Sequence, residues 1–182
     1  GSVTRPKAEM PNRTYTFHAA VTAIRKVVET TPANLRNSDV MQALRVVAES
    51  ASVVPHALLP RGVRHEETLR PRAGGKPQKL VWVLAGEEEL GQQLAGRPVI
   101  LYLHGGAFCL GTAQSYRHLG YTLALEAQAV VLLAEYRLLP EATIADALED
   151  CAAGYRAILE AGVPPGRVTI AGDSAGGNLT VQ

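Results

Sequence analysis

The segment from Val168 to Leu179, VTIAGDSAGGNL, restricts the fold of this 182-residue chain more than any other stretch. Near its start Val168, Ile170 and Ala171 are apolar, which fits a short buried strand. Residues 172–176 then match G-x-S-x-G, a pattern that presents a serine hydroxyl at a sharp strand-to-helix turn. Such a turn needs small neighbours, and glycine or alanine stands at 172, 175, 176 and 177. We therefore predict that Ser174 is a nucleophile at a helix N-terminus, where free N–H groups favour developing negative charge.

Strand and helix patterns alternate through the second half of the chain. Short apolar runs occupy residues 98–103 and 129–134 and precede Ser174, whereas residues 115–128 and 143–161 carry apolar side chains at helical spacing. Continuous apolar strands separated by amphipathic helices indicate a mostly parallel sheet that is covered on both faces. The predicted fold class is therefore α/β.

The first half of the chain predicts two helices and then two strands. Residues 14–31 have helical spacing, and Ser38 or Asp39 can cap a second helix. Residues 63–69 and 79–84 are strand candidates, with a loop rich in proline, glycine and basic residues between them. Glu87 to Glu89 are expected to form an exposed loop or a helix start. We predict a helical region at residues 1–60 and a sheet-containing domain at 61–182.

Composition excludes several classes of function. The net charge of +1 combines a basic first part, residues 1–80, with an acidic remainder. Because the basic residues are scattered and aromatic residues make up only 5% of the chain, nucleic-acid binding is not expected. The apolar runs are too short to form a transmembrane segment. Cys109 and Cys151 match neither a disulfide framework nor a metal site, which favours a reducing, cytoplasmic setting without a metal or other cofactor.

A second motif, His104-Gly105-Gly106-Ala107-Phe108, directly follows the strand at residues 98–103. Open α/β sheets place their ligands at the carboxyl ends of the strands. Paired glycines there can turn backbone N–H groups outward, which is how an oxyanion is stabilised in acyl transfer. On this motif alone, an ordinary tight turn with a hydrogen-bonded loop histidine is an equally good interpretation.

The two motifs, together with the segments between them, resemble one family of enzymes. HGGAF is followed by YRLLPE at residues 136–141, ALED at 147–150 and GDSAGG at 172–177. In this order they resemble the hormone-sensitive-lipase-like esterases of the α/β-hydrolase fold, over residues 97–182. The resemblance implies a carboxylesterase that acts on a small-molecule ester through an acyl-enzyme. It also implies that the N-terminal helices form part of a cap over the acyl pocket.

The resemblance assigns roles to individual residues. Ser174 matches the nucleophile, and the N–H groups of Gly105, Gly106 and Ala175 match the oxyanion hole. His104 matches a residue that shapes the glycine loop and not the general base. Ala107 replaces the third glycine of the family's motif, which a small side chain can satisfy.

The base and the acid of a serine triad have no candidate in the expected place. In α/β hydrolases both follow the serine in chain order, but none of the eight residues after Ser174 is Asp, Glu or His. The five histidines, His18, His56, His65, His104 and His118, all precede it. The strand before Ser174 would also be an unpaired, hydrophobic sheet edge. We therefore expect this chain to be the N-terminal portion of a hydrolase, which a companion segment or chain completes.

Two other functions fit the same residues. A fold does not determine a function, so the complete protein could be a non-catalytic receptor for a small ligand on the same scaffold. The chain could also be an inert, truncated fragment. No P-loop, dinucleotide-binding or H-E-x-x-H motif supports a nucleotide or zinc-protease function.

Overall fold

The computed structural model describes residues 38–72 and 75–182, apart from 53–59. The predicted helix at residues 14–31 therefore lies outside the described residues. By their internal contacts the residues form two compact units, Gly1–Val40 and Met41–Gln182, and the sheet with its covering helices belongs to the second. The predicted division near residue 60 stays a prediction.

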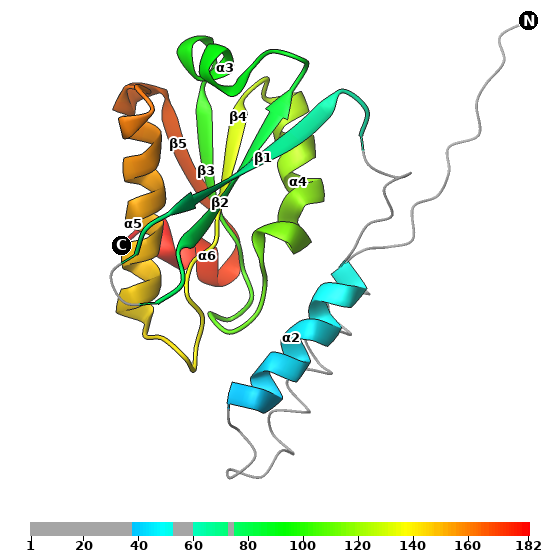
Figure 1. Cartoon of the computed structure of the whole chain (residues 1–182), viewed down its shortest axis with the longest axis vertical. Coiled ribbons are helices and arrows are strands. Elements are labelled where there is room, and N and C mark those ends of the chain that lie inside the picture. Colours follow the sequence, from blue (N-terminus) through cyan, green and yellow to red (C-terminus); the bar gives the residue numbers. More distant parts are fainter. Residues whose placement is uncertain (1–37, 53–59, 73–74) are drawn as a thin grey trace, which may run out of the picture. The chain divides into compact units, whose positions relative to one another are not determined.

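A five-stranded mixed sheet forms the centre of the second unit (Figure 1). Its strands are β1 (Val63–Arg70), β2 (Gln78–Ala85), β3 (Val99–Leu103), β4 (Val130–Ala134) and β5 (Val168–Gly172), in the spatial order β1-β2-β4-β3-β5. The last three are mutually parallel, whereas β1 and β2 join as an antiparallel pair beside β4. The predicted alternation of strand and helix and the α/β fold class are thus confirmed.

The helices follow the predicted pattern, with one addition. They are α2 (Ser38–Ser52), α3 (Leu90–Gly96), α4 (Ala113–Glu126), α5 (Ile144–Glu160) and α6 (Ser174–Leu179). Both α4 and α5 begin with a capping box, built by Thr112 with Ser115 and by Thr143 with Asp146. The short helix α3 has no counterpart in the prediction beyond Glu87 to Glu89, expected as an exposed loop or a helix start, which directly precede it.

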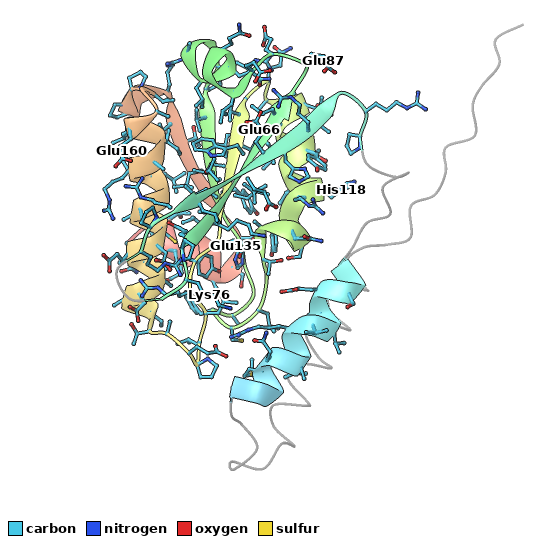
Figure 2. All side chains as sticks on the ribbon, viewed as in Figure 1. Glu66, Lys76, Glu87, His118, Glu135 and Glu160 are labelled. Atoms are coloured by element: carbon cyan, nitrogen blue, oxygen red, sulfur yellow. The ribbon has the colours of Figure 1, made fainter. Side chains whose placement is uncertain are left out.

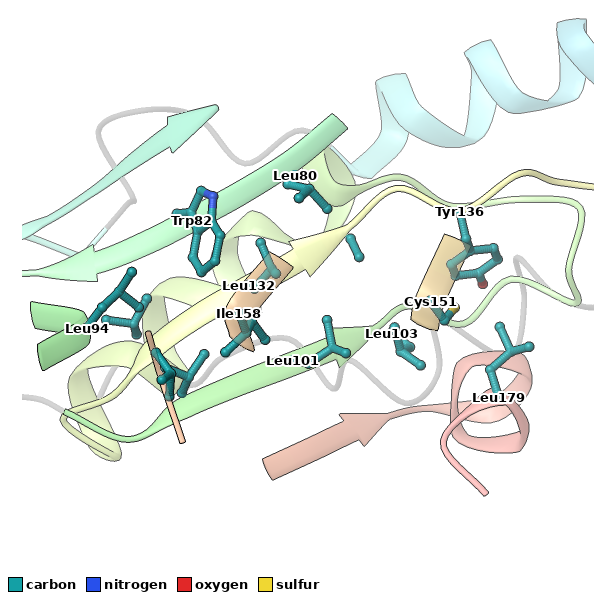
Figure 3. Close-up of a cluster of buried hydrophobic side chains, with 14 of the residues drawn as sticks. Leu80, Trp82, Leu94, Leu101, Leu103, Leu132, Tyr136, Cys151, Ile158 and Leu179 are labelled. Atoms are coloured by element: carbon teal, nitrogen blue, oxygen red, sulfur yellow. The ribbon is translucent and has the colours of Figure 1, made fainter. Parts of the chain in front are cut away.

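Each face of the sheet packs against one long helix, as the continuous apolar strands require. Alternate residues of β2 point to opposite faces, so that Leu80, Trp82 and Leu84 meet the α5 side, whereas Val81 and Val83 meet the α4 side. Figure 3 shows the first of these two clusters, in which Ile158 and Cys151 of α5 lie against the central strands. Because β3 is a central strand with buried residues on both faces, the strand that carries the HGGAF loop is held rigidly.

An ion pair at the end of β1 links this strand to helix α5. Arg70 at the end of β1 binds both carboxylate oxygens of Glu160, at 2.6 and 2.7 Å, and Glu160 belongs to α5 (Figure 2). The side chain of Glu160 is largely exposed, so this pair adds little stability. The edge strand β1 is therefore held mainly by its eight-residue register with β2.

Strand β5 forms the other edge of the sheet. It pairs with β3 from Val99↔Val168 to Leu103↔Gly172, and its second side pairs with no strand of the described residues. Ile170, in the middle of this strand, is 42% exposed, which is high for an isoleucine in a sheet. Within the described residues β5 is thus an open edge strand, as the sequence predicts, but it is less buried than the short buried strand expected there.

Candidate active site

Two neighbouring parallel strands bring the two glycine-rich motifs together. The ladder between β3 and β5 ends with Leu103 opposite Gly172, so His104 and Asp173 are the first residues beyond it on either side. Because both strands run in the same direction, the loops that follow them both begin at the carboxyl ends of the strands. The HGGAF loop and the GDSAGG turn are therefore adjacent.

Ser174 occupies the sharp turn that the sequence predicts. Its φ of 49° lies in the left-handed region, and its side chain is exposed at the first residue of α6. A Cβ on Gly172 would lie 2.6 Å from Leu103 O, and one on Gly176 would lie 2.0 Å from the same oxygen. Only glycine at these two positions lets the turn approach the end of β3 so closely, and this approach sets the height of the serine above the sheet.

Asp173 connects the turn to the other loop. Its Oδ1 accepts hydrogen bonds from Gly105 N at 2.8 Å and from the Tyr102 hydroxyl at 3.1 Å. Its Oδ2 accepts one from the Tyr116 hydroxyl at 2.9 Å. Burial and then the neighbouring Asp173 charge raise the pKa values of both Tyr102 and Tyr116, so both hydroxyls stay protonated donors. Sequence reasoning gave Asp173 no role, because these contacts join residues that are 57 to 71 positions apart.

The glycine loop takes a conformation that needs small residues. Gly106 has a φ of 126°, and its carbonyl accepts hydrogen bonds from the N–H groups of Cys109 and Leu110. Ala107 and Phe108 follow with φ values of 53° and 61°. Gly106 could not carry a side chain, since a Cβ would lie 2.0 Å from Leu110 O. The loop therefore doubles back at once after β3.

The backbone N–H groups of this loop differ in what they bind. Gly105 N donates to Asp173, so it is not free for an oxyanion, and its predicted donor role does not fit this structure. Within the described residues, no hydrogen bond engages the N–H groups of Gly106 or Ala107. Ala175, in the first turn of α6, has no intrahelical acceptor for its N–H either. The donor roles predicted for Gly106 and Ala175 stay predictions.

His104 is buried beneath the loop. Only 3% of it is exposed, its ring stacks on Tyr136 with centroids 4.2 Å apart, and Tyr136 donates from its hydroxyl to His104 O at 2.5 Å. Its Nδ1 lies 2.8 Å from Gly105 O, within reach for a neutral ring that carries its hydrogen on Nδ1. Burial lowers the pKa of His104 despite the Gly105 carbonyl and the Asp173 charge, which act to raise it. The ring is thus neutral near pH 7.

The YRLLPE and ALED segments meet each other. Arg137 donates to Asp150 from both its backbone N–H and its guanidinium, and it also pairs with Asp146 at 2.9 Å. Arg72 Nε lies 2.9 Å from Asp150 Oδ1, an ion pair without hydrogen-bond geometry.

Arg45 of α2 forms an ion pair with Glu141 and donates hydrogen bonds to the Leu139 and Cys109 carbonyls. Through Arg45, the YRLLPE segment is thus linked to Cys109, the residue that follows HGGAF.

No hydrogen bond or ring contact joins a described histidine to Ser174. His65 on β1 contacts Tyr121 and Arg117, at 2.8 and 3.0 Å, and His118 lies on α4 (Figure 2). His104 is buried against Tyr136 and Gly105, whereas His18 and His56 lie outside the described residues.

Two surface pockets of about 310 and 190 Å³ adjoin Arg72 and Arg137, and neither is lined by Ser174. In the described part of the chain, no three His, Cys, Asp or Glu side chains form a group that could hold a metal ion.

Comparison with known proteins agrees with this geometry. Residues 100–182 match the family model described as the alpha/beta hydrolase fold. An acetyl-hydrolase of Streptomyces hygroscopicus is 55% identical over 82 residues, which are 45% of this chain and 27% of that protein. Esterase LipU of Mycobacterium tuberculosis is 35% identical over 153 residues, or 76% of this chain and 49% of LipU. An esterase structure from the bacterial hormone-sensitive lipase family superimposes with a TM-score of 0.65 at 29% identity, covering 90% of this chain and 49% of that one.

In sequence and fold the chain is similar to the hormone-sensitive-lipase-like esterases of the α/β-hydrolase fold. The chain spans about half the length of LipU and of the superimposed esterase, and a smaller share of the acetyl-hydrolase. The resemblance that the motifs predicted is confirmed. Among the described helices, none combines the length and the apolar character that a membrane crossing needs.

Proposed function

We propose that the complete protein is a serine carboxylic-ester hydrolase in which Ser174 forms the acyl-enzyme. The observation that carries this proposal is the exposed Ser174 with a φ of 49°. The residue before it, Asp173, is hydrogen-bonded to Gly105 of the glycine loop, so the serine lies next to that loop. A serine in such a turn is presented to substrate, and the N–H groups beside it favour negative charge. Similarity to this family supports the same reaction class, since the relatives are esterases and acetyl-hydrolases by name.

The oxyanion is proposed to bind the N–H groups of Gly106, Ala107 and Ala175. All three lack a hydrogen-bond partner within the described residues, whereas Gly105 is engaged by Asp173. Two such donors lie in the loop after β3, and the third lies in the first turn of α6, next to Ser174 in sequence. Preorganised donors of this kind are commonly worth about 10²–10³ in kcat each.

A histidine and a carboxylate outside this sequence are proposed to complete the triad. The support is that none of the described histidines contacts Ser174, and that no Asp, Glu or His follows it. The same segment is proposed to pair with the open side of β5 and to cover Ile170. The N-terminal 60 residues are proposed to act as part of a cap over the acyl pocket.

The test compares this chain with a protein that also contains the completing segment. The complete protein should hydrolyse short-chain aryl esters and react with a fluorophosphonate, and peptide mapping should place the label on Ser174. Ser174→Ala should abolish both reactions, since nucleophile and base act as a unit. The 182-residue chain alone should be nearly inactive. Ligand binding without turnover in the complete protein would favour the receptor function, and a label on another residue would refute the assignment.

A further inference from the structure

Asp173 makes more contacts across the site than a turn residue requires. It precedes Ser174, yet its carboxylate forms no cap on the helix that starts there. It accepts instead from Gly105 of the loop, from Tyr102 of β3 and from Tyr116 of α4. No cationic side chain of the described residues pairs with it, so three neutral donors hold one carboxylate at the junction of three elements.

Asp173 and Gly105 are packed so closely that a movement of one residue displaces the other. A Cβ on Gly105 would lie 2.2 Å from Asp173 Oδ2 and 2.9 Å from its Cγ. Gly105 is therefore glycine because the carboxylate occupies the space of a side chain. The amides of Gly106 and Ala107 follow directly, so a shift of Gly105 moves them relative to the serine.

We propose that Asp173 is a positioning residue, which uses the Gly105 N–H and the Tyr102 and Tyr116 hydroxyls to fix the oxyanion loop against the Ser174 turn. This inference rests on the proposed ester hydrolysis and deepens it. The contacts of Asp173 are to Gly105, Tyr102 and Tyr116, so its proposed action is through the loop. Its effect falls on the step in which negative charge develops on the carbonyl oxygen, because misplaced donors lose most of their value there.

The chain offers a matched pair of tyrosines for the test. Tyr116 and Tyr121 both lie on α4, and each donates or shares one hydroxyl hydrogen bond, with Asp173 and with His65 respectively. Tyr116→Phe removes one of the three donors to Asp173, whereas Tyr121→Phe removes a hydroxyl of the same kind that does not contact Asp173. Asp173→Ala removes the acceptor entirely, and Asp173→Asn keeps its shape and one acceptor oxygen.

In the complete protein, Asp173→Ala should lower kcat for a short-chain aryl ester by about 10²-fold while KM changes by less than about 3-fold. Asp173→Asn should recover part of this loss. Tyr116→Phe should lower kcat several-fold, and Tyr121→Phe should leave it unchanged. A trifluoromethyl ketone, whose adduct carries the oxyanion, should lose affinity in parallel with kcat. Equal kcat values and ketone affinities in Tyr116→Phe, Tyr121→Phe and wild type would overturn the proposal, including where Asp173→Ala fails to fold.

Hydrogen exchange separates this proposal from the proposed function. Peptides that cover residues 104–108 should exchange faster in Asp173→Asn and Tyr116→Phe than in wild type, but not in Tyr121→Phe. Absence of ester hydrolysis in the wild-type complete protein would refute the enzyme function, and the exchange comparison would still decide whether Asp173 fixes the loop. Unchanged exchange in both variants would refute the positioning role even in an active enzyme.

Discussion

Arg137 holds both carboxylate oxygens of Asp150, with Nε donating to Oδ2 at 2.9 Å and Nη2 donating to Oδ1 at 3.1 Å. Asp150 is buried in α5, whereas Arg137 lies in the loop after β4 that carries Tyr136. The pair therefore fixes to α5 the segment that carries Tyr136, whose hydroxyl donates to His104 O at the start of the glycine loop.

Asp150→Ala should lower the free energy of unfolding by about 3–5 kcal/mol, because it leaves Arg137 and Arg72 without their buried partner. The control is Lys79→Ala, which breaks the exposed pair with Glu67 at 3.6 Å and should cost about 1 kcal/mol or less. Urea unfolding of both variants measures the difference. Similar losses in the two variants would contradict a structural role of the Arg137–Asp150 pair.

Gly176→Ala should be strongly destabilising although alanine favours helices. The added Cβ would lie 2.0 Å from Leu103 O and 2.5 Å from His104 O, so α6 would have to move away from β3. Gly91→Ala in α3 is the matched control, since nothing lies within 4 Å of its Cβ position. The control should gain about 0.5–1 kcal/mol from helix propensity. Thermal unfolding that shifts upward in both variants would show that the turn is not tightly packed.

Ser174→Gly should be more stable than Ser174→Ala, by up to about 1 kcal/mol. At a φ of 49° any residue with a Cβ carries strain that glycine does not, and this exceeds the entropy that glycine loses on folding. Both variants lack the hydroxyl, so the comparison isolates the backbone. Chemical unfolding midpoints decide it, and a clearly less stable glycine variant would show that the turn is unstrained.

Stability should fall as the pH is lowered below about 6.5, in part because of His104. Burial lowers its folded-state pKa below the ordinary value of 6.5, so below 6.5 the unfolded chain binds a proton that the folded chain does not. The contribution is fully present above pH 6.5 and is lost as pH falls towards the folded pKa.

His104→Phe should keep the stacking on Tyr136 and flatten this pH dependence between pH 7.5 and 5. His65 has a pKa lowered by burial and acts in the same direction, whereas burial raises the pKa of Glu135, which opposes it. Both are present in wild type and variant, so the difference between their unfolding free energies at each pH isolates His104. A difference that does not change with pH would contradict a buried, neutral ring.

The elements of the fold were predictable where apolar runs are continuous. β3 and β4 begin and end within one residue of the predicted apolar runs, because strands buried on both faces leave an unbroken apolar pattern. Helix α3 was harder to predict, since its seven residues include few apolar side chains. The antiparallel placement of β2 beside β4 was not predicted, because nothing in either strand specifies its neighbour.

The site was predictable in its motifs but not in its contacts. The position of Ser174 follows from the glycines around it, which a compact turn demands. The engagement of Gly105 N by Asp173 depends on the register between β3 and β5 and could not be read from either motif alone. The Arg137–Asp150 pair was present in the sequence as two recognisable segments, without a sign that they meet.

The ladder between β3 and β5 has a consequence for how such proteins tolerate change. With Leu103 opposite Gly172, one inserted or deleted residue in either strand would slide one motif past the other by about 3.3 Å and turn it to the opposite face. Loop sequences around the site can therefore drift as long as small residues stay in place, while strand length cannot. The spacing between Ser174 and the loop amides is therefore determined by the number of residues in β3 and β5.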